Sequence, residues 1–221
     1  MSPSRIKLPS QTAALAGIPA GIQAAGPWSG RRQLFVRFAD EAETATIYTS
    51  EALRGELKRL AARSRYHSIA IAGRDPLAEG EYLAAVLGDG APLPVMLDHD
   101  GQRPEALEPL LRLLALVQID VDGTESDPAL ERIYASLTLA AGKHVKHALV
   151  IAPASDASDA LLLRIVERAG GASSETEMIV HPSPESARDP DRRWVAWLER
   201  ASQVHGDVRV VPSLPAPTGM K

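Results

Sequence analysis

Short apolar runs recur along the chain from residue 33 onward, and segments with helical spacing of apolar residues separate them. The runs are four to seven residues long and rich in Val, Ile and Leu, which is typical of strands buried on both faces of a parallel sheet. They lie at residues 33–38, 67–72, 94–97, 116–121, 145–151, 177–180 and 207–211. This alternation predicts an α/β fold of repeated βα units with mainly parallel strands.

Four of the intervening segments carry an apolar stripe that predicts a helix with one buried face. Ser50 can cap the first helix, Pro109 should break the second near its start, and Gly170-Gly171 is a stop signal for the third. The stripes are Leu53, Leu57, Leu60 and Ala61; Leu107, Leu110, Leu111 and Leu114; Leu162, Ile165, Val166 and Ala169; and Trp194, Trp197, Leu198 and Ala201. We expect all of these side chains, tryptophans included, to pack in the core.

Residues 1–25 are rich in Ala, Gly, Pro and Ser and show little periodicity. Segments of this kind at a terminus are typically mobile. We therefore expect a flexible N-terminal arm over residues 1–21, a single α/β domain over residues 22–216 and a C-terminal tail over residues 217–221.

The composition excludes several classes of function. The 221 residues contain no cysteine, so a disulfide, a thiolate zinc site and a cysteine nucleophile are impossible. A net charge of −4, with four Tyr, three Trp and two Phe, disfavours binding to nucleic acid. No run approaches the ~20 apolar residues of a membrane helix, and the first residues lack the apolar centre of a signal peptide. We expect a cytoplasmic protein without a membrane partner.

Polar residues gather in the loops that follow the predicted strands. In folds built from βα units, the chemistry lies on loops at the carboxyl ends of strands. These loops hold residues 40–50, Gly73-Arg74-Asp75-Pro76, Asp98-His99-Asp100-Gly101, Asp120-Val121-Asp122 and His181-Pro182.

Taken in order, these segments resemble the 7-carboxy-7-deazaguanine synthase family, a short branch of the radical S-adenosylmethionine enzymes. The family's Gln-Gly-Glu-Gly-Pro and Phe-Val-Arg segments are similar to Gln23-Ala24-Ala25-Gly26-Pro27 and Phe35-Val36-Arg37. Its late Val-Arg-Val-x-Pro-Gln-x-His-Lys segment resembles Val208-Arg209-Val210-Val211-Pro212-Ser213-Leu214-Pro215-Ala216. The resemblance covers about residues 22–216 and implies a partial (β/α)6-type barrel.

The positions that differ from the family pattern are mostly its functional ones. The Cys-x3-Cys-x2-Cys motif falls on Glu41, Ala45 and Tyr48. A [4Fe–4S] cluster needs thiolates, whereas alanine has no ligand atom and hard oxygen donors do not suit a sulfide-bridged cluster. We therefore expect no [4Fe–4S] cluster and no radical chemistry.

The cofactor and substrate positions implied by the resemblance are altered as well. The Gly-Gly-Glu-Pro turn, which receives the amino group of S-adenosylmethionine, becomes Gly73-Arg74-Asp75-Pro76, and the Glu-Thr-Asn-Gly turn becomes Asp98-His99-Asp100-Gly101. Ala25 replaces an acid and Pro215 replaces a histidine. We expect no bound S-adenosylmethionine.

The favoured hypothesis is therefore a catalytically degenerate, non-radical relative of the family that acts as a binding, regulatory or partner subunit. Through the family's dimer surface it would form a homodimer, or a heterodimer with a related subunit. Arg37 could pair with the carboxylate of a small ligand in a bidentate manner, or simply hold an internal ion pair. The candidate ligand-binding residues are Arg37, Gln23, Asp98, His99, Asp100, Asp120 and Asp122.

An enzymatic alternative uses the acidic loops. Asp98, His99, Asp120 and Asp122 fall at the ends of neighbouring strands, and such a set can bind a divalent metal and activate water. This would make a metal-dependent hydrolase or lyase of the Asp98–Asp100 and Asp120–Asp122 loops. Asp is also common in turns for purely structural reasons, and a fold that binds no ligand is the third possibility.

Overall fold

A sheet of ten strands forms the centre of the protein in the computed structural model, which describes residues 12–188 and 192–211. The strand order is β10-β9-β8-β7-β6-β5-β3-β1-β4, with β2 paired to β3. From β3 through β5 to β10 all neighbours are parallel, whereas β1, β2 and β4 pair in antiparallel fashion. The strands are β1 (Thr12–Gly17), β2 (Ala20–Ile22), β3 (Arg32–Phe38), β4 (Thr46–Thr49), β5 (Ser68–Gly73), β6 (Val95–His99), β7 (Leu116–Val121), β8 (Lys146–Ile151), β9 (Glu177–Val180) and β10 (Val208–Val210).

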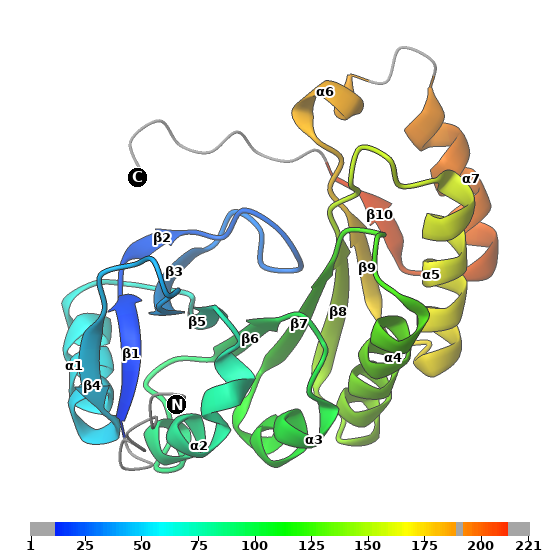
Figure 1. The fold of residues 1–221 in the computed structure, drawn as a ribbon. Coiled ribbons are helices and arrows are strands. Elements are labelled where there is room, and N and C mark those ends of the chain that lie inside the picture. Colours follow the sequence, from blue (N-terminus) through cyan, green and yellow to red (C-terminus); the bar gives the residue numbers. More distant parts are fainter. Residues whose placement is uncertain (1–11, 189–191, 212–221) are drawn as a thin grey trace, which may run out of the picture.

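The helices cover one face of this sheet. Successive parallel strands are immediate neighbours, so right-handed crossovers place every connecting helix on the same side. Figure 1 shows these helices around the outside of a curved, open sheet whose edges are β4 and β10. They are α1 (Ser50–Arg63), the 3-10 turn η1 (Pro76–Glu79), α2 (Gly80–Leu87), α3 (Pro104–Leu107), the 3-10 helix η2 (Glu108–Leu113), α4 (Asp127–Gly142), α5 (Asp159–Ala172), α6 (Pro184–Ala187) and α7 (Arg193–Val204). In the part of the chain that the structure describes, no helix has the length and apolar character needed to cross a bilayer.

Alternate residues of each central strand serve two different cores. Side chains such as Leu34, Leu97 and Ile119 face the helices and belong to one large cluster. On the concave face, a small cluster of Ala70, Met96 and Leu116 is covered by Trp28 and Phe35. Burial on both faces explains why these strands read as continuous apolar runs.

All seven predicted strand positions are confirmed, and 116–121 and 177–180 match to the residue. The predicted break at Pro109 is confirmed too, because α3 ends at Leu107 and the chain continues as the 3-10 helix η2. The cap of α1 is Thr49, whose Oγ1 accepts a hydrogen bond from the Ala52 N–H at 3.1 Å, rather than Ser50.

The predicted stop at Gly170-Gly171 is wrong. Helix α5 continues through both glycines to Ala172, and the Ser173 N–H donates to the Ala169 carbonyl at 3.0 Å. A Cβ at position 170 would lie 2.9 Å from His205 Nδ1. Gly170 therefore serves the close approach of the chain after α7, and the packing of α5 outweighs the cost of about 1 kcal/mol for glycine in a helix.

The expectation of a flexible arm does not hold from Thr12 onward. Residues 12–22 form β1 and β2, and the alternate residues Ala13 and Leu15 of β1 are buried in the main core. Strand β1 pairs with both β3 and β4, so its backbone hydrogen bonds are made within the sheet. Pro215 and the tail over residues 217–221 lie outside the described residues.

The first prediction compares two isoleucines on strands. Ile119 on β7 is fully buried, whereas Ile47 on β4 is 55% exposed. We expect Ile119→Ala to lower the free energy of unfolding by about 3 kcal/mol, because it removes buried methyl groups and leaves a cavity. Ile47→Ala should cost less than about 1 kcal/mol. Urea denaturation at pH 7 measures both, and equal losses would contradict the assignment of the two faces.

Candidate functional site

The positions expected to match the cluster cysteines do not form a metal centre. Glu41 and Ala45 lie exposed in the loop between β3 and β4, and Glu41 forms an ion pair with Arg74 at 2.9 Å. Tyr48 lies in β4, opposite Ala13 of β1, and packs against the main core. The segment therefore supplies one exposed carboxylate, one alanine and one half-buried phenol.

The turn Gly73-Arg74-Asp75-Pro76, which we expected to correspond to the family's cofactor-binding turn, forms ion pairs with other residues of the chain. Gly73 has φ +103°, and a Cβ there would overlap the backbone of Phe38. Arg74 contacts Asp40 at 3.2 Å as well as Glu41. The Arg103 Nε–H is shared between both carboxylate oxygens of Asp75, each at 2.9 Å, and Arg103 Nη2 donates to Asp75 Oδ2 at 2.7 Å. Pro76 begins η1, so the side chains of this turn are engaged with each other at the surface.

Arg37 and Gln23, both predicted ligand-binding residues, have internal partners. Arg37 Nη2 lies 2.8 Å from Glu43 Oε1, so the carboxylate that pairs with this arginine belongs to the chain itself. Gln23 is buried, and its backbone exchanges hydrogen bonds with Arg31 and Gly30 at 2.9 and 2.8 Å. Gln23 therefore closes the base of the loop between β2 and β3.

Asp98 and Asp120 do meet, on the concave face at the carboxyl ends of β6 and β7. Gln118 on β7 is paired in register with Asp98, and it lies two residues before Asp120, so all three side chains share one face. Gln118 Nε2 donates to Asp98 Oδ1 at 3.4 Å and to Asp120 Oδ1 at 3.2 Å. The structure thus brings together two carboxyls bridged by one amide.

The surroundings of the two carboxyls raise the pKa of both. Surrounding protein atoms replace much of their water, and this desolvation raises the pKa of both Asp98 and Asp120. The charge of the neighbouring Asp120 raises the pKa of Asp98 further, to well above its ordinary value. Asp98 is therefore the more readily protonated of the two. Asp120 is exposed to solvent, and Asp98 is half-buried.

The other acidic-loop residues are not part of this pair. His99 follows Asp98 directly and points to the opposite face, where its Nδ1 accepts a hydrogen bond from the Gly101 N–H at 3.0 Å. Burial lowers the pKa of His99 to about 4, so the ring is neutral at pH 7. Asp100 is exposed, and Asp122 accepts hydrogen bonds from Thr124 N and Oγ1 at 2.8 and 2.6 Å.

The predicted metal site is therefore not assembled as expected. Only Asp98 and Asp120 of its four members come together, because alternation along the strand turns His99 away and Asp122 is held in its own turn. Within residues 12–188 and 192–211, no group of three or more His, Asp or Glu side chains is arranged to hold a metal ion.

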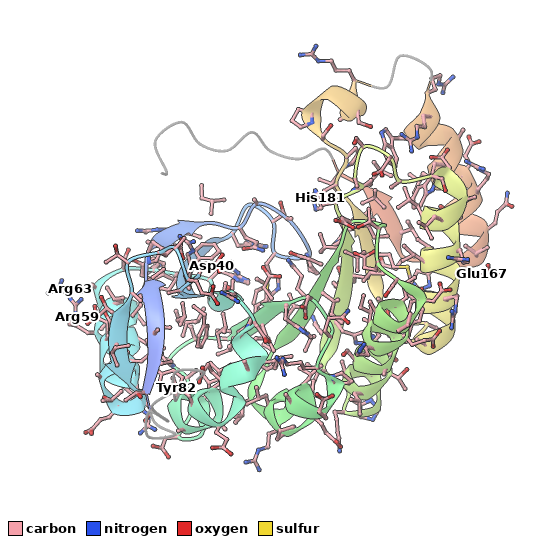
Figure 2. The ribbon with its side chains drawn as sticks, viewed as in Figure 1. Asp40, Arg59, Arg63, Tyr82, Glu167 and His181 are labelled. Atoms are coloured by element: carbon pink, nitrogen blue, oxygen red, sulfur yellow. The ribbon has the colours of Figure 1, made fainter. Side chains whose placement is uncertain are left out.

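The loop between β2 and β3 reaches across the concave face to this pair. The Gly26 N–H donates to His181 Nε2 at 3.2 Å, just beyond β9, and Gly26 contacts Gln118. Figure 2 places His181 at the end of β9 and Asp40 on the opposite side of the concave face, beyond β3. Burial lowers the pKa of His181, which keeps its nitrogen available as an acceptor.

Sequence reasoning did not identify Gln118 or the role of Gly26. The available signal was a polar residue in the middle of an apolar strand, two residues before Asp120 and hence on the same face. The contact of Gly26 with residues 118 and 181 joins distant segments, and no local pattern indicates it.

No protein-family model matches the chain, and no curated protein matches it. The fold and the chemistry of the side chains are therefore the basis of the functional argument.

A prediction concerns the contact of the loop between β2 and β3 with Gln118. Gly26 and Gly30 both have positive φ, +82° and +79°, but a Cβ at position 26 would overlap the Gln118 amide, whereas a Cβ at position 30 meets nothing within 4 Å. Gly30→Ala should cost about 1 kcal/mol through backbone strain alone. Gly26→Ala should cost about 3 kcal/mol, because Gln118 must also leave its place between the carboxyls. Urea denaturation measures both variants, and equal losses would rule out this contact.

A further prediction uses the raised pKa of Asp98. The folded state holds a proton that the unfolded state releases above its ordinary pKa of 3.8, so this pair lowers stability as the pH rises through and above that value. Relative to the wild type, Asp98→Asn should gain stability as the pH rises from 4 to 7, by about 1 kcal/mol, because the amide stays neutral without taking up a proton.

Asp122→Asn is the matched control for this experiment. Hydrogen bonds from Thr124 lower the pKa of Asp122, so its contribution to stability grows as the pH rises and is lost in acid. The control should therefore lose stability relative to the wild type at pH 7 and not at low pH. Urea denaturation across this range measures both, and the same pH dependence for Asp98→Asn and the wild type would contradict the raised pKa of Asp98.

Proposed function

We propose that this protein is a cysteine-free, non-radical relative of 7-carboxy-7-deazaguanine synthase that acts as a ligand-binding or regulatory subunit. The order of its segments supports this proposal. Residues that resemble the family's motifs follow β3, β5 and β6 in turn, each at the carboxyl end of a parallel strand. A singly wound sheet with helices on one face is also the arrangement expected from a partial barrel.

The observation that carries the proposal is the structure of residues 41–49. A radical enzyme of this kind would need three thiolates here, and the chain supplies Glu41, Ala45 and Tyr48. Residues Thr46–Thr49 also form β4, with all four residues paired to β1. This segment serves as an edge strand of the sheet, and its side chains cannot provide the soft ligands of an iron–sulfur cluster.

The polar groups at the carboxyl end of the sheet support a binding role. Asp98, Gln118 and Asp120 remain grouped on the concave face, where ligands bind in many folds of βα units. Arg37 is already paired with Glu43, so we place the ligand-binding function on the carboxyl pair. As a regulatory subunit the protein would act with a second copy or with a related chain.

Anaerobic reconstitution with iron and sulfide tests the proposal directly. We expect well below about 0.1 iron atom per chain after desalting, and no cleavage of S-adenosylmethionine in the presence of a strong reductant, because no thiolate is present. A known [4Fe–4S] protein treated in parallel shows that the procedure loads clusters. Stoichiometric iron and sulfide, or reductive cleavage of the cofactor, would overturn the proposal.

A further inference from the structure

The sheet has two open edges, and they differ in how well they are protected. At one edge, β10 is three residues long, and its central Arg209 pairs with Glu177 of β9 at 2.7 Å. At the other edge, β4 reads Thr-Ile-Tyr-Thr, with no charged residue and no proline. Natural sheets usually protect an edge with charges, proline or a bulge, because its unpaired backbone groups can pair with another chain. The side chains of β4 leave its edge free to accept a further strand.

Ile47 gives this edge the character of a contact surface. Its side chain is 55% exposed, the largest value among the exposed large hydrophobic residues of the described ranges. Neighbouring residues of a strand face opposite sides, so Ile47 points away from the core into which Tyr48 packs. Glu41 and Glu43, just before β4, are both held in ion pairs within the chain. An uncharged strand that exposes an isoleucine beside paired charges suits another protein strand better than water.

Helix α1 extends this surface on its side away from α2. Arg54 of α1 binds α2 and the turn that follows it, whereas Glu56, Arg59 and Arg63 lie on roughly the opposite side of the helix. A hydrogen bond from Glu56 and the nearby Tyr48 of β4 both raise the pKa of Arg59, so this side of α1 lies next to β4. Figure 2 shows Arg59 and Arg63 at the outer margin of the molecule. Strand and helix therefore present one continuous surface.

The charges along α1 match an antiparallel copy of the same helix. Glu51 and Glu56 lie in its first half, and Lys58, Arg59 and Arg63 lie in its second half. A two-fold axis that sets two α1 helices antiparallel places the acidic half of one against the basic half of the other, and it also aligns their helix dipoles favourably. A partner of a single charge sign, such as a polyanion, lacks this match. The surface is thus complementary to itself.

We propose that the protein forms a two-fold homodimer in which β4 pairs in antiparallel fashion with β4 of a second copy, flanked by the two α1 helices. This inference rests on the proposed subunit role and names the partner and the surface. Opposite residues of an antiparallel pair lie on the same face of the sheet, so Ile47 has to meet a residue of its own face. The axis therefore passes beside Ile47, which faces Ile47 of the second copy, while Thr46 faces Tyr48.

The helix is a necessary part of this interface. Stable interfaces bury about 1,200–2,000 Å² in total, and the four residues of β4 span only about 13 Å. The 14 residues of α1 add a length of about 21 Å. Ala52, Gly55 and Ala62 are exposed on α1, and a Cβ at Gly55 would meet nothing within 4 Å. These small residues allow a second helix to approach closely.

Light scattering after size-exclusion chromatography of the full chain tests the dimer. We expect twice the 23.6 kDa mass of the chain. The dissociation constant should lie below about 10 μM, so that a sample at about 100 μM is mostly dimeric. Ile47→Lys brings two like charges together at the axis and should weaken the dimer by about tenfold or more. Val204→Lys, at a residue 47% exposed on α7, is the matched control and should leave the mass unchanged.

The absence of native cysteine allows a direct test of the register. Ile47→Cys introduces the only thiol of the chain. Opposite residues of antiparallel strands have Cα atoms about 4.5–5.5 Å apart, which a disulfide can span. Mild oxidation should therefore link most of the Ile47→Cys protein into a covalent dimer on a non-reducing denaturing gel. Val204→Cys, treated in parallel, should run mostly as a single chain.

Two charge-reversed variants test the contact between the helices. Arg59→Glu with Arg63→Glu makes this side of α1 acidic, and Glu51→Lys with Glu56→Lys makes it basic. Each double variant should be mostly monomeric alone, because like charges then oppose each other across the axis. An equimolar mixture of the two should dimerise, because an acidic helix now meets a basic one. Near-UV circular dichroism verifies the native fold of every variant.

Four results would overturn the inference. These are a wild-type chain that stays monomeric at this concentration, an undiminished dimer in Ile47→Lys, equal crosslinking of the two thiol variants, or a mixture no more dimeric than its components. The iron content after reconstitution is a separate readout, so a failure here and a failure of the non-radical proposal are distinguishable.

Discussion

Each parallel strand pairs with the one that comes before it in the chain, and the rest of this structure depends on that arrangement. When each crossover is right-handed and each strand adds next to the last, all connecting helices lie on one face of the sheet. The other face then has to be covered by something else. Here Trp28 from the loop after β2 and Phe35 of β3 pack on Ala70, Met96 and Leu116. The carboxyl end of this concave face is where polar groups from β6, β7 and β9 come within reach of one another.

The sequence predicts the central strands well and the first part of the sheet poorly, for one physical reason. A strand buried on both faces is a continuous apolar run, and such a run is visible without any knowledge of its partners. Strand β1 buries only two alternate residues, Ala13 and Leu15, and β4 has Ile47 exposed. Their stability comes from antiparallel pairing with each other and with β3, a long-range arrangement that no short window of sequence contains.

The sequence also located some residues of the candidate site and missed others. Loops after predicted strands correctly located Asp98 and Asp120, because parallel strands bring their carboxyl ends to one edge. Adjacency in sequence was misleading for His99, since neighbouring residues of a strand face opposite sides and this histidine belongs to the helix side. Gln118 was overlooked because it interrupts an apolar run, although its parity with Asp120 places the two together. The alternation of side chains along a strand therefore predicts which residues share a face better than their closeness in sequence does.

The carboxyl pair acts against the stability of the fold. The raised pKa of both acids lowers the free energy of unfolding at neutral pH, and an amide oxygen left without a hydrogen-bond partner adds a further cost of about 1–3 kcal/mol. Apolar side chains at these positions would extend the cluster of Met96 and Leu116 that already lies on this face. Natural sequences tend to depart from local consistency where a site needs it. The pair lies at the carboxyl ends of β6 and β7, where ligands bind in many folds of βα units, so the groups that weaken the free protein are the ones we assign to binding.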